Sequence, residues 1–478
     1  MKELTIVQMN DTHAYFELHP ELFWAGKSAK YRPAGGYARI SALLRQLEDK
    51  EKYLLALDCG DTIHGTFAAV ESEGQALVPI LQQLPFTAMT AHWEFAYGPQ
   101  RLQEVAAQIP YPLLAANCYD EESNERVFEP YTIHETGSLR VGIVGLAAYI
   151  VDKVMPDSFS KGIRMTLGLE ELPQLIKTLR QEEKADLVVV ISHLGFPQEM
   201  QLAQDVDGID VLLSAHTHNR LWAPVRVNDT LVMQSGSHGA FLGALAVQVE
   251  QGRVIDFRHR LLMVDEPITP DPIVAEIVDA VLGPHRDLLN EVVGETRTAL
   301  NRATVLESTT DNFLLQSLLH VQDAHVAFSH GWRYGAPVPA GPVTREQLYN
   351  IVPMNPALFT IEMSGEEIWT MLEQNLEQVF ARNPYEQVGG NVKRCLGLNG
   401  YIKFENPAGR RLQELFIRGE KVQPDRSYSA VFITTQGVPE QFGHNRQKLD
   451  VRAVEAMERY LQEAGPARAE RQDTFTAI

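Results

Sequence analysis

Five short clusters of aspartate and histidine stand directly after predicted strands. In extended chain, residues i and i+2 point to the same side, so Asp11 and His13 can reach one metal ion, and Asp61 has two oxygens able to bridge two ions. A single histidine beside a strand is ordinarily a hydrogen-bonded loop residue, but five such clusters at strand ends predict a metal site. The clusters are Asn10-Asp11-Thr12-His13, Asp58-Cys59-Gly60-Asp61, Ala91-His92-Trp93-Glu94, Ser192-His193-Leu194-Gly195 and Ala215-His216-Thr217-His218.

Short apolar runs alternate with helical patterns through the first half of the chain, which predicts a layered α/β domain. Ile40, Leu43, Leu44 and Leu47 share one helix face, and a second helix is expected around Leu172 to Leu179. Two later runs, Leu231 to Gln234 and Ala244 to Glu250, lie close together and favour antiparallel strands. The buried strands are predicted at Leu4–Met9, Tyr53–Leu57, Leu113–Ala116, Arg140–Leu146, Asp186–Ile191 and Val211–Leu213.

A proline-rich segment, residues 266–272, indicates a boundary, because proline cannot continue a sheet. Pro272 suits the first turn of a helix that carries Ile273, Ile277 and Val281 and is interrupted at Gly283-Pro284. We therefore expect a catalytic domain over residues 1–266, a linker helix over 267–292, and a second mixed domain over 293–478 that ends in a helical stretch, Val451 to Leu461.

The composition of the chain limits the kinds of partner that it can bind and the cellular compartment that it suits. The chain has 478 residues and a formal net charge of −20, which argues against a nucleic-acid polymer or an acidic membrane as partner. Three scattered cysteines do not suit a disulfide framework, and the first residues have no apolar leader pattern. The longest apolar run, Val141 to Val151, is too short to span a bilayer. These features predict a soluble, cytoplasmic protein.

With these motifs the chain resembles the dimetal calcineurin-like phosphoesterases of the 5′-nucleotidase type. The resemblance implies an α/β fold: a four-layer α/β/β/α metallophosphoesterase domain followed by a smaller mixed α/β domain of the 5′-nucleotidase C-terminal type. The residues that carry it, beyond the five clusters, are Gly65-Thr66, Ala116-Asn117, Gln234-Ser235-Gly236, Glu307-Ser308, Gly331-Trp332-Arg333, Ala340-Gly341-Pro342-Val343-Thr344 and Met363-Ser364-Gly365-Glu366.

The resemblance also implies a ligand set for two divalent metal ions, Mn²⁺ or Zn²⁺. Asp11, His13, Asp61 and His218 would surround one ion. Asp61, His193 and His216 would surround the other, together with His92 from the third cluster. In such enzymes a metal-bound hydroxide attacks phosphorus in line, and the metal pair stabilises the charge on the phosphoryl oxygens. His19, His64, His238 and His330 are further candidates near this site, and each equally suits a hydrogen-bonded loop.

The third cluster departs from the nucleotidase pattern Gly-Asn-His-Glu-Phe-Asp-Tyr-Gly. Residues 91–98 read Ala-His-Trp-Glu-Phe-Ala-Tyr-Gly, so the metal-binding Asn becomes His92, the catalytic His becomes Trp93, and its orienting Asp becomes Ala96. An indole cannot shuttle a proton, so the usual leaving-group acid is absent. The His-Trp-Glu-Phe sequence is similar to the SoxB thiosulfohydrolase branch, in which a dimanganese centre releases a sulfonate from a carrier-bound cysteine. A sulfur leaving group needs less protonation than an alkoxide.

Substrate contacts are expected from the second domain. Arg333 suits a bidentate contact to an anion, and Trp332, Tyr334 and Tyr385 are candidates to line a pocket, although aromatic side chains are commonly plain core. The two aromatics that clamp a base in the nucleotidases are absent. Met354 stands at the first place, and the second should precede a Gly-Gly-Asp-Gly stretch, where this chain reads Ile433-Thr434-Thr435-Gln436-Gly437-Val438. The candidates for direct catalysis are His92, Trp93 and Arg333.

These observations favour a dimetal-dependent hydrolase that acts on a small anionic phosphoester or sulfur analogue between its two domains. One alternative is a cytoplasmic SoxB-like thiosulfohydrolase acting on a cysteine-bound or small sulfur compound. Such an enzyme could have a protein carrier as its partner. SoxB proteins, however, are exported and longer, so the carrier would be in another compartment. Another is a nucleotide or other phosphomonoester hydrolase that manages without the His–Asp pair. A third is a degenerate metal-binding protein without turnover.

Overall fold

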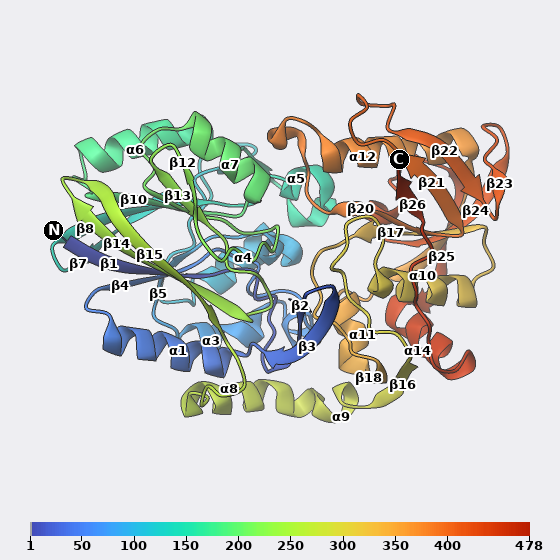
Figure 1. The fold of residues 1–478 in the computed structure, drawn as a ribbon, viewed down its shortest axis with the longest axis horizontal. Helices are drawn as coiled ribbons and strands as arrows, with labels where there is room; N and C mark the ends of the chain where they lie inside the picture. Colours follow the sequence, from blue (N-terminus) through green and yellow to red (C-terminus); the bar gives the residue numbers. More distant parts are fainter. Residues whose placement is uncertain (1) are drawn as a thin grey trace. The chain divides into compact units, whose positions relative to one another are not determined.

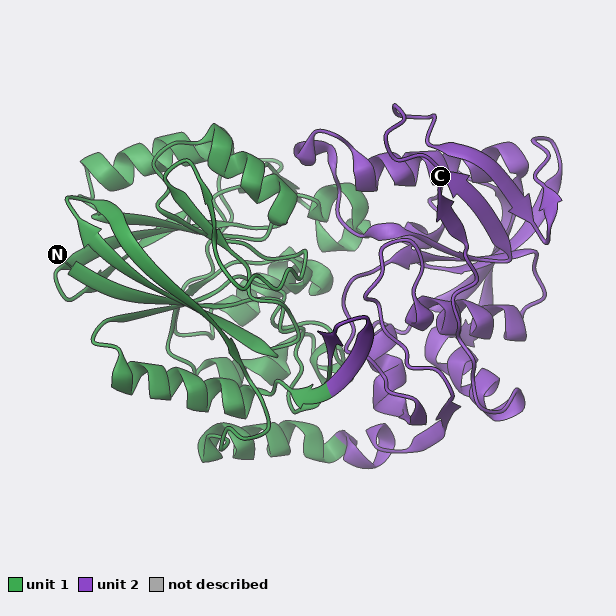
Figure 2. Cartoon of the chain, viewed as in Figure 1, with its two compact units in different colours: residues 1–21, 32–284 green, residues 22–31, 285–478 purple. Residues whose placement is uncertain are grey.

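The computed structural model describes residues 2–478, which form two compact units. One unit comprises residues 1–21 and 32–284, and the other comprises residues 22–31 and 285–478 (Figure 2). Among the described residues, no helix has the length and apolar character needed to cross a membrane.

The first unit has four layers, α/β/β/α, with two sheets in the middle (Figure 1). One sheet has the strand order β15-β14-β1-β4-β5, and the other has the order β12-β13-β11-β10-β8-β7. The first is built from β1 (Lys2–Met9), β4 (Leu54–Asp58), β5 (Phe86–Met89), β14 (Phe241–Glu250) and β15 (Arg253–Met263). The second is built from β7 (Tyr131–Thr136), β8 (Leu139–Leu146), β10 (Leu187–Ser192), β11 (Val211–Leu213), β12 (Val225–Val227) and β13 (Thr230–Met233).

Helices cover the outer faces of the two sheets. The helices α6 and α7 lie over the six-stranded sheet, and α1 and α3 lie over the five-stranded sheet (Figure 1). These and the smaller elements of the unit are α1 (Tyr37–Lys50), α2 (Phe67–Glu71), α3 (Val78–Leu81), α4 (Pro99–Ala106), α5 (Val151–Val154), α6 (Glu171–Gln181), α7 (Phe196–Asp205), β6 (Cys118–Asp120) and β9 (Ile163–Met165). A hairpin of β2 (His19–Ala25) and β3 (Ser28–Ala34) follows β1, and its residues 22–31 belong to the second unit.

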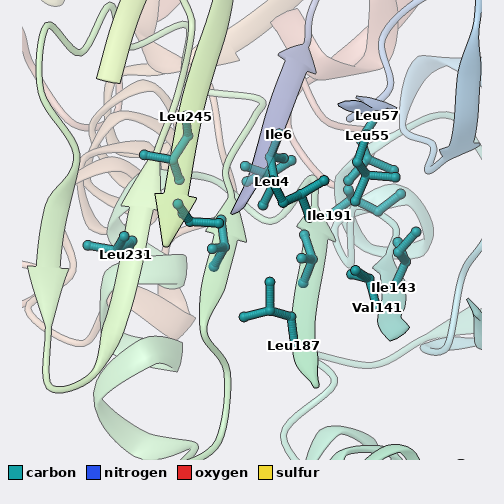
Figure 3. Close-up of a cluster of buried hydrophobic side chains, with 14 of the residues drawn as sticks. Leu4, Ile6, Leu55, Leu57, Val141, Ile143, Leu187, Ile191, Leu231 and Leu245 are labelled. Atoms are coloured by element: carbon teal, nitrogen blue, oxygen red, sulfur yellow. The ribbon is translucent and has the colours of Figure 1, made fainter. Parts of the chain in front are cut away.

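The core of the first unit lies between its sheets. Alternate residues of each strand point inward, so Leu4 and Ile6 of β1 meet Val141 and Ile143 of β8 and their neighbours in one fully buried cluster (Figure 3). The intervening residues face the helices, so these strands are buried on both faces. That burial explains why they read as continuous apolar runs in the sequence.

Most predicted strands of this unit are present, but one expectation is wrong. Leu113–Ala116 forms only isolated bridges, Met89 with Leu113 and Leu114 with Glu129, because its backbone N–H groups bond to three different segments, at Met89, Glu129 and Gly145. The runs at Leu231 and Ala244 are antiparallel strands, as expected: β13 pairs antiparallel with β12, and β14 pairs antiparallel with β1 and β15. They belong to different sheets, and β13 also lies parallel to β11.

The helix after the proline-rich segment is α8 (Pro272–Leu282), with Pro272 in its first turn and the Asp271 side chain accepting a hydrogen bond from the Ile273 N–H as N-cap. Its buried residues are Val274, Val278 and Leu282, whereas Ile273 is 52% exposed. The predicted apolar face, which began at Ile273, is therefore displaced by one residue. Contacts of Asp271 with Ser41 and the Ala38 carbonyl on α1 set this rotation.

The second unit contains a five-stranded mixed sheet, β20-β17-β24-β19-β25, and a four-stranded sheet, β23-β22-β21-β26. Phe328, Ile361 and Phe432 lie in its buried core. Its main elements are α9 (Arg286–Leu289), β16 (Val292–Thr296), α10 (Thr309–Val321), β17 (Val326–Gly331), β18 (Gly341–Thr344), α11 (Arg345–Ile351), β19 (Ala357–Ser364), α12 (Gly365–Phe380), β20 (Asn391–Leu396), β21 (Leu398–Ile402), β22 (Leu412–Ile417), β23 (Glu420–Lys421), β24 (Ser427–Ile433), α13 (Thr434–Gly437), β25 (His444–Arg452), α14 (Ala453–Glu463) and β26 (Phe475–Ala477).

Candidate metal centre

The five Asp and His clusters follow the carboxyl ends of β1, β4, β5, β10 and β11. β1 runs parallel to β4, and β4 runs parallel to β5. In the facing sheet, β10 runs parallel to β11. Parallel neighbours end at the same edge of a sheet, which is where ligands collect in α/β proteins. The fold therefore brings residues that lie more than 200 positions apart in the sequence to one edge of the first unit.

The side chains at this edge form two groups that share Asp61. Within each group the candidate ligand atoms all lie within 4.8 Å of one another. Donors on opposite sides of one cation stand about 4.2 Å apart when each bond is about 2.1 Å, so these separations suit a common ion. The first group is Asp11, His13, Asp61 and His218, and the second is Asp61, His92, His193 and His216.

Asp61 occupies the middle of the arrangement. Its Oδ2 atom lies 3.1 Å from His92 Nδ1 and 3.2 Å from His193 Nε2, and 3.8 Å from His13 Nε2. Its Oδ1 atom accepts a hydrogen bond from the Trp93 backbone N–H at 2.8 Å. One carboxylate thus faces donors of both groups, which is the position of a bridging ligand in a two-metal site.

The backbone at this edge is unusual. Asp11, His13, Asp61, His216 and His218 all have φ between 49° and 70°, in the left-handed region that non-glycine residues rarely adopt. Such conformations cost of order 1–3 kcal/mol each and cluster at functional sites. Five of the seven candidate ligands therefore have an unfavourable backbone conformation. This indicates that the position of their side chains is what the structure at this edge maintains.

Contacts behind the candidate ligands fix their orientation. His193 Nδ1 lies 2.6 Å from the Cys59 carbonyl, so this nitrogen donates and Nε2 faces the centre. Glu94 accepts the backbone N–H groups of Thr62 at 2.6 Å and His92 at 2.7 Å, and so ties the second cluster to the third. Metal-binding histidines commonly have partners of this kind.

The pKa values of the buried candidate ligands depend on two opposing effects, burial and the neighbouring charges. Burial raises the pKa of Asp61, but His92 and His193 lower it more, so the net shift is well below the ordinary value. Burial lowers the pKa of His193, but Asp61 and Asp11 raise it to about 10. Burial alone dominates at His13 and lowers its pKa to about 3. The ionised carboxylates therefore attract positive charge into a buried cluster, as a divalent cation would supply.

The donor set fits divalent cations. Imidazole nitrogen and carboxylate oxygen together suit zinc and manganese. His92 is buried, and its Nε2 atom has no hydrogen-bond partner among the described residues. A buried imidazole nitrogen without a partner is costly, and a cation would satisfy it.

Trp93 and Ala96 lie in a short 3₁₀ turn, Trp93–Tyr97, beside the centre. The Trp93 ring packs edge-on against His64, with centroids 4.7 Å apart, and lies 5.8 Å from the His13 ring. Both ring nitrogens of buried His64 lack hydrogen-bond partners among residues 2–478. The turn thus places an apolar indole beside the candidate ligands, at the position where a proton-carrying histidine was expected from the nucleotidase pattern.

The four substrate candidates belong to the second unit. Trp332 and Tyr334 are buried there, with 8% and 3% of their surface exposed, and the Tyr334 hydroxyl donates to the Ile351 carbonyl. The Arg333 guanidinium donates to the Gly390 carbonyl at 2.8 Å. Tyr385 lies in a 3₁₀ turn, Pro384–Glu386.

A buried ion network supports the loop that carries Arg333. Asp311 lies 3.0 Å from Arg302 Nε and 2.8 Å from Arg394 Nε, and all three side chains are at most 2% exposed. Arg302 also donates to the Tyr334 carbonyl at 2.7 Å and to the Ile351 carbonyl at 3.0 Å. Arg302 and Arg394 therefore both have a structural role in this unit.

The structure also contains a cluster of three residues that the sequence did not predict to lie together. His19, Glu21 and His238 form a third group of candidate ligand atoms within 4.8 Å of one another. The spacing of His19 and Glu21 on β2 is the only local signal, because His238 is more than 200 residues away.

Comparison with known proteins identifies related families. Residues 4–220 match the calcineurin-like phosphoesterase family, and residues 291–435 match the 5′-nucleotidase C-terminal domain. The trifunctional nucleotide phosphoesterase protein YfkN of Bacillus subtilis is 24% identical over 471 residues, which are 88% of this chain and 30% of that longer protein. An apyrase of Tabanus yao is 24% identical over 476 residues, covering 90% of this chain and 84% of the relative.

Solved structures show the same fold. The sulfate thiohydrolase SoxB of Thermus thermophilus aligns with a TM-score of 0.91 and 25% identity, covering 99% of this chain and 96% of that one. A 5′-nucleotidase precursor from Thermus thermophilus aligns with a TM-score of 0.87 and 24% identity, covering 100% and 99% of the two chains.

Proposed function

Because the chain belongs to the superfamily of metal-dependent hydrolases that joins a calcineurin-like phosphoesterase domain to a 5′-nucleotidase C-terminal domain, we propose that it hydrolyses a small anionic ester, either a phosphoester or a sulfur analogue. The observation that carries the proposal is the pair of donor groups joined by Asp61. A purely structural metal site is typically closed and holds one ion, so two adjoining groups argue against a degenerate protein without turnover.

When bound, two divalent cations, Mn²⁺ or Zn²⁺, would activate water as a nucleophile and offset charge on the transferred group. The role of the protein is to hold these cations and to orient their ligands. Asp61 faces both donor groups, and the Cys59 carbonyl fixes the His193 ring so that Nε2 points inward. Glu94 holds the loops of Asp61 and His92 together through their backbone N–H groups.

A sulfur substrate is favoured by the third cluster. Trp93 has only an indole N–H and Ala96 has no polar group, so this turn supplies no acid to protonate a departing alkoxide. A thiol ionises near pH 8.5, so a thiolate leaves without such help. The similarity to the SoxB structure agrees with this reading. We therefore place a thiosulfonate or cysteine-bound sulfonate first among the substrate classes, and nucleotides second.

The test is a substrate panel measured with added manganese or zinc on two proteins, the wild type and the double variant Trp93→His/Ala96→Asp. The wild type is expected to turn over a thiosulfonate faster than any nucleotide. The double variant restores the acid pair of the nucleotidase pattern, and its phosphomonoester hydrolysis is expected to rise, since general acid catalysis contributes about 10²–10⁴-fold. The control is the thiosulfonate rate, which should not rise with it.

Two outcomes would contradict this ordering. Efficient nucleotide hydrolysis by the wild type would show that the missing pair is unnecessary and would favour the nucleotidase alternative. A metal-loaded wild type that hydrolyses no phosphoester, anhydride or sulfur compound would favour the degenerate binding protein.

Arg333 is proposed to bind the anionic end of the substrate, because a guanidinium presents a planar pair of donors to phosphate or sulfonate. Arg333→Gln is expected to raise KM by about tenfold or more, since a charge-assisted hydrogen bond contributes about 1.5–3 kcal/mol. Steady-state kinetics on the preferred substrate measures the effect. Arg382→Gln, which removes an exposed arginine of the same unit, serves as the control. An unchanged KM in Arg333→Gln would remove this residue from the substrate site.

We further propose a cytoplasmic protein with a small anionic substrate, without a nucleic-acid polymer or a membrane as partner. The net charge of −20 and three buried cysteines outside any disulfide support this assignment. Recovery of the native protein in the periplasmic or secreted fraction would contradict it, and would make an exported carrier protein a plausible partner.

A further inference from the structure

A second polar cluster lies beside the candidate metal centre in the first unit. His19 and Glu21 stand two residues apart on β2 and therefore point to the same side of the strand. His238 comes from the turn between β13 and β14, where its φ of 58° puts the backbone in the left-handed region. The three residues share no member with the groups around Asp61.

The distances within this cluster suit coordination of one ion. The candidate ligand atoms all lie within 4.8 Å of one another, and His238 Nδ1 is 3.1 Å from Glu21 Oε2. Neighbouring donors of a tetrahedral zinc stand about 3.3 Å apart when the bonds are about 2.0–2.1 Å. The His19 and His238 rings are nearly perpendicular, with centroids 6.0 Å apart.

His19 is held with one nitrogen available. Its Nδ1 atom lies 3.1 Å from the Glu17 carbonyl and so acts as the donor, which leaves the lone pair on Nε2. The Nε2 atom is buried and has no hydrogen-bond partner in the described part of the chain. The ring packs 4.4 Å from the Tyr15 ring, and a Cβ at Gly35 would come within 2.4 Å of its Cε1 atom. The position of the imidazole is therefore strongly restricted.

The charges of the cluster also suit a cation. Burial, assisted by His238, lowers the pKa of His19 to about 4, so this imidazole is neutral at pH 7. Burial raises the pKa of Glu21, but His238 and Arg220 lower it more, so the carboxylate is ionised. Arg220 holds Glu21 Oε1 at 2.9 Å and packs over the Phe241 ring, which orients Oε2 toward His238.

We propose that His19, Glu21 and His238 bind a third divalent cation, which we assign as zinc. Two imidazoles and one carboxylate are the ligand set of catalytic mononuclear zinc sites, which keep a further position for water or an anion. The His238 ring lies 5.8 Å from the His218 ring and 6.1 Å from the His13 ring, so this ion would stand next to the centre at Asp61 while using separate ligands. The alternative is a purely structural role, in which Glu21 and Arg220 form an ion pair that only orients His238.

Zinc stoichiometry of the full chain distinguishes these possibilities. The protein is stripped with a chelator, reloaded with zinc, and dialysed against a weak competing chelator that removes loosely held surface ions, and bound zinc is measured by elemental analysis. The wild type is expected to retain about three ions per chain, and His19→Ala and Glu21→Gln about two. His134→Ala removes a half-buried histidine on β7, outside all three groups, and is expected to retain about three.

The outcomes separate this site from the centre at Asp61. A wild type that retains about two ions, with Glu21→Gln also retaining about two, overturns the third site and leaves the two-cation centre intact. Retention of the third ion by folded His19→Ala or Glu21→Gln overturns it as well. If His19→Ala fails to fold, Glu21→Gln decides, because it keeps the side-chain volume and an acceptor for Arg220. A wild type with one ion that is lost in Glu21→Gln would instead contradict the centre at Asp61 and support this site.

Discussion

Asp61→Ala is expected to abolish binding of both cations at the centre and to lower turnover by at least about 10³-fold. Its Oδ2 atom faces His92 and His193 of one group and His13 of the other, so its loss removes a shared ligand from both. Two-metal sites contribute several kcal/mol of transition-state stabilisation, and each 1.36 kcal/mol is tenfold in rate. Bound metal and the rate on the preferred substrate are measured together.

A matched carboxylate tests whether the effect is local. Asp49→Ala removes an exposed aspartate on α1 and should leave metal content and rate unchanged. Asp61→Asn, which keeps the shape and one acceptor oxygen, should also lose metal, because its charge no longer attracts cations. Full activity of Asp61→Ala with normal metal content would refute the proposed centre.

Asp311→Asn is expected to destabilise the second unit by about 3–5 kcal/mol. This carboxylate neutralises Arg302 and Arg394, and all three side chains are almost completely buried. Removing one partner leaves uncompensated buried charge, which is the costly way to break a buried ion pair. Urea unfolding measured through tryptophan fluorescence reports the change, since Trp332 and Trp369 both lie in this unit.

The control is a surface pair of the same chemistry. Asp323 is fully exposed and lies 3.6 Å from exposed Arg418, so Asp323→Asn should leave the free energy of unfolding nearly unchanged. Equal effects of the two substitutions would contradict the structural role of Asp311.

The Asp311 effect has a defined pH dependence. Burial raises the pKa of Asp311, but Arg302 and Arg394 lower it more, so its pKa in the folded protein is below the ordinary value of 3.8. The carboxylate therefore contributes its full stability above about pH 4, and this contribution is lost as pH falls through the folded pKa. The stability difference between wild type and Asp311→Asn should be constant near neutral pH and shrink only below about pH 4.

Local patterns predicted those features of the fold that depend on neighbours in sequence. The strands at Leu4 and Val211 were predicted because each is a short apolar run with turn residues behind it. The helix α8 was predicted with its proline start, but its buried face was displaced from Ile273 to Val274. Helical periodicity defines how often a face recurs, whereas contacts with another helix decide which face is buried.

Long-range polar contacts were beyond the reach of such patterns. Glu21 and His238 stand 3.1 Å apart but 217 positions apart in the sequence. Arg302 and Asp311 are only nine positions apart, but their partner Arg394 lies on β20, far along the chain. Nothing in the spacing of these residues distinguishes them from ordinary surface charges, because their burial results from the packing of sheets and helices around them.

By itself, the sequence determined the chemistry available to this protein: two aspartates and five histidines after strands, and a tryptophan and an alanine where an acid pair was expected. Strand ends bear ligands at i and i+2, so residue type and spacing suffice to indicate a metal site. Only the tertiary structure decided that Asp61 stands between two donor groups and that His19, Glu21 and His238 form another. These arrangements depend on which strands are parallel neighbours and on the path of the loops that follow them. The strand order in turn depends on burial of the apolar core of the whole unit.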